Sequence, residues 1–157
     1  MLKELLAGRL FGHPLHPILV HFPAALFPTS LLFDLLSLYR TSGDPTFVKV
    51  AFYTMVIGEV AAGAAAVTGA IDYFTKVLPG TAAFRVGTLH ALLNVAILLL
   101  YGFNLGLRLG PTLEVSRMPV SPLLLSVAGV AALTASNYLG GRLVYHYGVG
   151  VRLTSQH

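Results

Sequence analysis

The sequence predicts an all-α integral membrane protein: a four-helix up-and-down bundle with both termini on the same side, in one domain over residues 1–157. Hydrophobic residues make up 55% of the chain and charged residues 10%, with a mean hydropathy of +0.77, whereas about a quarter of a typical soluble domain is charged. The apolar residues form four stretches, each long enough for the roughly 20-residue span of a bilayer. Short turns separate the stretches, so neighbouring spans should run antiparallel.

The four expected spans follow one another with little chain between them. They run from Ile18 to Tyr39, from Phe47 to Phe74, from Phe84 to Leu109 and from about Pro122 to Tyr147. Helices are expected because lipid offers no partner to an unpaired backbone polar group. Pro28 should kink the first helix, because proline has no backbone N–H to donate. The turns are at residues 40–45, 79–80 and 110–122.

The composition excludes several classes of protein. The chain has no cysteine, which rules out disulfides, iron–sulfur clusters and c-type haem attachment. Its net charge is +4, but the basic residues are scattered over short loops. They are expected to contact lipid headgroups and to set topology, so we expect the lipid bilayer as a partner and no nucleic acid. No HExxH, GxSxG, P-loop or dinucleotide-binding fingerprint is present, and whether the protein is an enzyme stays open.

The basic residues also predict an orientation. We call side A the side that holds both termini and the loop between spans two and three, and side B the other. Side A carries Lys3, Arg9, Lys76, Arg85, Arg142 and Arg152, and side B carries Arg40, Lys49, Arg108 and Arg117. Because positive charge is retained in the cytoplasm, this distribution favours cytoplasmic termini.

This topology gathers most of the histidines at one side. The expected side A cluster contains His13, His16, His21, Asp72, His90 and His146. An ionisable group at membrane depth suggests a functional site by default. Asn94 lies four residues after His90 and Arg142 four before His146, so each should share a helix face with its histidine and support it. We therefore expect one pocket in which these groups meet.

A b-type haem is the first function that this cluster predicts. Spans one and three are diagonal neighbours in such a bundle, and His21 and His90 both lie about one turn inside their spans. Bis-histidine ligation by these two residues would serve electron transfer, with a redox partner or a quinone. His146 with His16 or His13 would suit a second haem, and Arg142 a haem propionate. Small residues along span two leave space for the macrocycle.

Two other functions remain open. The same histidines with Asp72 suit a non-haem site for iron, zinc or copper. They also suit a non-enzymatic membrane subunit with a structural or proton-relay histidine network, either alone or as a homo-oligomer. Glu59 lies well inside span two, where we expect it either to make an interhelical contact in its protonated form or to act in a proton relay. Beyond the side A cluster, the polar positions that we count inside the spans are Glu59, Asn104 and Thr134. These are too few to form a polar path from side A to side B, which disfavours a pump or channel.

Four motifs resemble a known family. They are GHPLHPILVHFP from Gly12, Gly69-x-x-Asp72, His90-x-x-x-Asn94 and GGRLVYHYGVGV from Gly140 to Val151. In this order they resemble the predicted bacterial membrane proteins of domain-of-unknown-function family 2231, from whose usual pattern Ala24 and Ala25 depart slightly. The resemblance implies a multi-pass protein of the bacterial inner membrane. Relatives associated with redox modules favour electron transfer, but the resemblance implies no settled activity.

Overall fold

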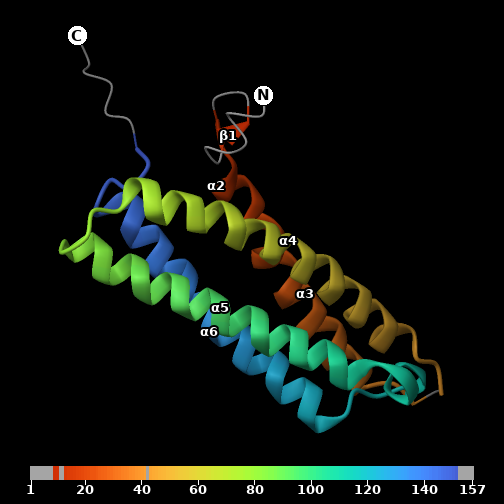
Figure 1. Cartoon of the computed structure of the whole chain (residues 1–157). Helices are drawn as coiled ribbons and strands as arrows, with labels where there is room; N and C mark the ends of the chain where they lie inside the picture. Colours follow the sequence, from red (N-terminus) through yellow and green to blue (C-terminus); the bar gives the residue numbers. More distant parts are fainter. Residues whose placement is uncertain (1–8, 11–12, 42, 152–157) are drawn as a thin grey trace.

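The computed structural model describes residues 9–10, 13–41 and 43–151. It confirms an all-α bundle in which four segments are long and apolar enough to cross a membrane (Figure 1). The described elements are β1 (Arg9–Leu10), β2 (His13–Pro14), α2 (Leu15–Leu19), α3 (His21–Ser37), α4 (Thr46–Lys76), α5 (Ala82–Arg108), the short helix η1 (Gly110–Glu114) and α6 (Val120–Tyr145). β1 and β2 pair antiparallel just before the first span.

The first span consists of two helices, α2 and α3, which meet at Val20. Pro23 lies three residues beyond this break and has no N–H with which to bond the carbonyl of Leu19, so the helical ladder is weakened there. The helix α3 continues through Pro28 to Ser37. The interruption therefore comes earlier than Pro28, and it separates His16 on α2 from His21 on α3.

The helices form a ring in which sequence neighbours pack side by side. The helix α3 packs on α4 and α6, and α5 packs on the same two helices. The helices α3 and α5 are therefore diagonal partners across the bundle, as expected. In Figure 1 the start of the first span and the end of α6 lie at the same end, which is side A.

Side chains close the turns at both ends of the bundle. At the start of α5, the Thr81 hydroxyl accepts a hydrogen bond from the Phe84 N–H at 3.1 Å, which is a typical N-cap. Between α3 and α4, the Asp44 carboxylate accepts bonds from the Thr46 hydroxyl and the Thr46 N–H, and it pairs with Arg40. These interactions, the Thr46 hydroxyl foremost, lower the pKa of Asp44 below its usual value.

An apolar core fills the middle of the bundle. Phe27 stacks on Tyr101 with ring centroids 3.7 Å apart, and Met55, Ile97 and Leu133 pack around them. A Cβ at Gly129 would lie 2.6 Å from the Tyr101 ring, so only glycine lets α6 approach α5 this closely. This core separates one cluster of polar side chains near side A from another near side B.

Candidate functional site

His16 and His90 lie opposite each other near side A. His16 belongs to α2 and His90 to α5, so the pair joins the first and third spans across the bundle. Their ring centroids are 6.5 Å apart and their planes meet at 82°. Both side chains are partly buried.

Each ring is oriented by the backbone of a neighbouring helix. Nδ1 of His16 lies 2.8 Å from the carbonyl oxygen of Ala65 on α4, and Nδ1 of His90 lies 3.0 Å from that of Ser136 on α6. Because a carbonyl oxygen only accepts hydrogen bonds, each Nδ1 must carry the proton. Each Nε2 then carries the lone pair of its ring, and that of His90 lies 3.3 Å from the Asn94 amide nitrogen. A metal-ligating histidine uses the same arrangement, in which the second nitrogen donates to a fixed acceptor.

Asn94 holds His90 against α6. Its amide nitrogen donates to the His90 carbonyl at 2.8 Å and to the Ser136 hydroxyl at 2.7 Å, and it lies 3.3 Å from both ring nitrogens of His90. Ser136 is fully buried, and its hydroxyl lies 3.1 Å from Nδ1 of His90. Asn94 is thus placed to fix the orientation of the His90 ring.

Two glycines make space for the rings. A Cβ at Gly69 would lie 2.8 Å from Cε1 of His16, and a Cβ at Gly140 would lie 3.1 Å from Cε1 of His90. A side chain at Gly69 would displace the ring, and one at Gly140 would crowd it. Both glycines belong to the sequence motifs named above, and their contacts give those motifs a steric reason.

From the sequence, His21 is expected opposite His90, whereas the structure brings the ring of His16 close to that of His90. His21 is the first residue of α3 and is exposed. On a continuous helix, residues five apart point about 140° away from each other, so His16 and His21 would not share a face even without the break. The break at Val20 also separates the helices that carry them.

The other expected members of the side A cluster lie apart from this pair. His13 is exposed on β2, and His146 is exposed beyond the end of α6, with its ring edge-on to Tyr147. Asp72 pairs with Lys76 one turn later. Arg142 donates to the Tyr147 hydroxyl at 3.4 Å. Over residues 9–10, 13–41 and 43–151, no three His, Asp or Glu side chains come close enough to hold a metal ion, so the expected common pocket does not form.

The structure shows a second polar cluster, near side B, which is not among the sites predicted from the sequence. Asp34 on α3 and Arg108 on α5 are both fully buried and form a bidentate ion pair with N–O distances of 2.7 and 2.6 Å. Asn104 accepts from Nε of Arg108 at 3.0 Å, and the Ser126 hydroxyl bonds both Arg108 and Asp34. These bonds tie α3, α5 and α6 together. Two signals point to the cluster: an aspartate inside an apolar span, and the four-residue spacing of Asn104 and Arg108.

The inward face of α5 carries polar side chains along most of its length. Its polar members are His90, Asn94, Tyr101, Asn104 and Arg108, spaced three, four or seven residues apart. The buried Ile97 is the apolar residue between them. The expectation of few polar groups beyond the side A cluster omitted Asp34 and Arg108, although the apolar core around Ile97 still separates the polar residues of the two sides. It depended on hydropathy, which hides single polar residues on one helix face.

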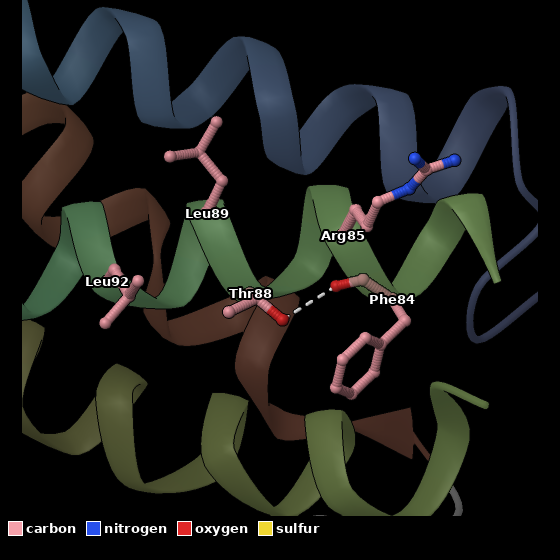
Figure 2. A pocket seen from close by; sticks show the side chains of 5 residues that line it. All are labelled: Phe84, Arg85, Thr88, Leu89 and Leu92. Atoms are coloured by element: carbon pink, nitrogen blue, oxygen red, sulfur yellow. Dashed lines mark hydrogen bonds between the residues drawn. The ribbon is translucent and has the colours of Figure 1, made fainter. Parts of the chain in front are cut away.

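The outer face of α5 carries an apolar groove at the level of His90. It is lined by Phe84, Arg85, Thr88, Leu89 and Leu92 (Figure 2). Leu89 and Arg85 point toward one side of the helix and Phe84 and Leu92 toward the other, while the Thr88 hydroxyl donates to the Phe84 carbonyl. This surface suits contact with lipid chains.

The fold and the side A pair define a multi-pass membrane protein with facing histidines in a four-helix bundle. The comparison with known families is specific: the model of the family described as "Predicted membrane protein (DUF2231)" matches residues 12–153. The chain belongs to this family, and it contacts the lipid bilayer. No curated protein and no solved structure matches the chain.

Proposed function

We propose that this protein binds a b-type haem between His16 and His90 and transfers electrons in the membrane. The observation that carries the proposal is the facing pair of imidazoles, each with Nδ1 bonded to a backbone carbonyl. Such rings can offer Nε2 to one iron while the Nδ1 hydrogen bonds to the backbone stay in place.

The spacing of the rings supports this assignment. Two imidazoles that ligate one metal ion from opposite sides, each at about 2.0 Å, have ring centroids roughly 6 Å apart. The observed separation is 6.5 Å. Gly69 and Gly140 let the two rings lie close against α4 and α6, because a Cβ at either glycine would meet the neighbouring ring.

The number of ligands favours haem over a non-haem metal. One or two protein ligands are enough to hold a haem iron, whereas protein sites for zinc or non-haem iron use three or four side chains. Asp72, the carboxylate of the non-haem alternative, is paired with Lys76. Iron, zinc or copper without a porphyrin would therefore need ligands beyond the two facing histidines.

A six-coordinate haem is suited to electron transfer with a redox partner or a quinone. We place the protein in the bacterial inner membrane with cytoplasmic termini. Burial of Arg108 supports this orientation, because it removes one cation from the side B count and leaves Arg40, Lys49 and Arg117 there. Arg142, near side A, is the basic side chain that we assign to a propionate.

Absorption spectra of the purified protein test this proposal. Protein expressed with ample haem should show a Soret band and, in reduced-minus-oxidised spectra, the sharp α band of low-spin haem. His16→Ala and His90→Ala should each lose haem or turn high-spin and bind carbon monoxide. His21→Ala and His146→Ala are matched controls, because these histidines are exposed, and they should keep the wild-type spectrum. A wild-type protein without a Soret band would overturn the proposal, as would unchanged spectra in the His16 and His90 variants.

One observation favours a second candidate, a structural histidine network. His16 already joins α2 to α4, and His90 joins α5 to α6, through bonds that need no metal. In that case the wild type has no Soret band, yet His16→Ala and His90→Ala still lower the melting temperature more than His21→Ala does.

A further inference from the structure

Two hollows follow one another along the side A end of α5. The first is a cavity of about 330 Å³ between the turn that joins α4 to α5 and the chain that follows α6, and its polar side chains are Lys76, Thr81 and Tyr147. The second is the apolar groove of Figure 2, with a volume of about 320 Å³. Ala83 lines the cavity and Phe84 lines the groove, so the two hollows adjoin on the first turn of α5.

Positive charge is in excess where the two hollows meet. Lys76 lines the cavity, and Arg85 lines the groove. Arg85 lies four residues after Thr81 and therefore shares a helix face with that cavity residue, and in Figure 2 it points toward the blue ribbon of α6. Among the described residues, Lys76 is paired with Asp72, whereas Arg85 has no ion-pair partner. A negatively charged group would therefore be attracted to this end of the bundle.

The cavity also offers a hydroxyl donor. Nη2 of Arg142 donates to the Tyr147 hydroxyl at 3.4 Å. Because the tyrosine oxygen accepts this bond, its own proton is available to a second acceptor. Cationic side chains and hydroxyl donors are the partners that bind the oxygens of a phosphate, so the polar lining of the cavity suits a phosphate ester.

The groove has the opposite chemistry. Leu89 and Leu92 are 55% and 63% exposed. The Thr88 hydroxyl already bonds the Phe84 carbonyl and the Tyr73 hydroxyl. A hydrocarbon chain can therefore lie in the groove without depriving a polar group of its partner, which a polar ligand would not improve.

We propose that this end of α5 binds one anionic phospholipid, with its phosphate held by Lys76 and Arg85 and one acyl chain in the groove. The excess of positive charge favours an anionic lipid over a zwitterionic one. The apolar groove favours a lipid over a free phosphate, because only the lipid buries apolar surface there. The site depends neither on haem nor on electron transfer, so it goes beyond the function proposed above.

Native mass spectrometry of the purified full chain in detergent tests the choice of lipid. Phosphatidylglycerol, which carries a net negative charge, should bind at least severalfold more tightly than phosphatidylcholine. Arg85→Gln should weaken phosphatidylglycerol binding about fivefold, the usual effect of one cation at a membrane surface. Arg117→Gln removes the same charge from an exposed position at side B and should leave the affinity unchanged. Equal affinities for the two lipids, or equal effects of the two variants, would overturn the proposal.

The ion pair of Lys76 gives a test in the opposite direction. Asp72→Asn should strengthen phosphatidylglycerol binding severalfold, because it frees Lys76 from its carboxylate partner. Glu114→Gln is the matched control, because it frees Lys49 from an equivalent exposed pair at side B, and it should have no effect. Binding that is unchanged or weaker in Asp72→Asn would refute the role of Lys76.

A third comparison separates a lipid from a soluble anion. Leu92→Trp should weaken phosphatidylglycerol binding severalfold, because the larger side chain fills the groove. Leu124→Trp, at a position on α6 that is 61% exposed, should not. Unchanged binding in Leu92→Trp, or displacement of the lipid by millimolar inorganic phosphate, would assign the cavity to a soluble anion and overturn the lipid site. These readouts are the same whether or not the protein contains haem.

Discussion

Asp34→Asn should destabilise the bundle strongly, because it leaves the Arg108 guanidinium buried without a counter-charge. Both side chains are 0% exposed, and two charge-assisted bonds of 2.7 and 2.6 Å join them. Such bonds contribute about 1.5–3 kcal/mol each, and removing one partner of a buried pair costs about 3–5 kcal/mol. Asparagine has nearly the same shape as aspartate, so little of this loss reflects packing. We expect a loss of about 3–5 kcal/mol in the free energy of unfolding.

Thermal unfolding in detergent, followed by circular dichroism, measures this effect. For a chain of this size 1 kcal/mol corresponds to roughly 2–4 °C, so the melting temperature should fall by about 6–20 °C. Lys49→Gln is the matched control, because it breaks the exposed pair with Glu114, which should contribute no more than about 1 kcal/mol. The double variant Asp34→Leu/Arg108→Met should be more stable than Asp34→Asn, because it buries no unpaired charge. Equal melting temperatures for Asp34→Asn and Lys49→Gln would refute the reasoning.

Three further predictions follow from single contacts. Gly69→Ala should displace the His16 ring, because its new Cβ would lie 2.8 Å from Cε1; haem content and the visible spectrum would report the change, and Gly63→Ala, with open space at its Cβ, should leave both unaltered. Tyr101→Phe should keep or raise the melting temperature, because it removes a buried hydroxyl that has no hydrogen-bond partner among the described residues; a marked loss would contradict the unpaired hydroxyl. The folded-state pKa of Asp44 is lowered, so the ionised carboxylate should stabilise the fold above its unfolded pKa, and this effect should be lost as the pH falls through the folded pKa. The difference in melting temperature between wild type and Asp44→Asn should therefore vanish in acid. A difference that grew in acid would contradict this sign.

The spans and their antiparallel order could be predicted from the sequence, because lipid imposes a length and an apolar composition that are read locally. The prediction for the first span, Ile18 to Tyr39, differs from the structure mainly at its start, where α2 begins at Leu15. The importance of His90 and Asn94 could also be anticipated, because residues four apart on one helix share a face. The structure bears out this neighbourhood, with the Asn94 amide nitrogen 3.3 Å from both nitrogens of the His90 ring.

The partners of these residues depended on tertiary structure. His16 and His21 are five residues apart, about 7.5 Å along a helix, and both lie at the side A end of the first span, so the sequence position alone cannot choose between them. The choice depends on the rotation of a short helix about its axis and on the break at Val20, which packing against α4 fixes. Likewise Asp34 and Arg108 are 74 residues apart, so in the sequence each appears as a single charge in its own span. Hydropathy reports how deep a residue lies, whereas a site requires that two residues face each other, and only the packed bundle determines that direction.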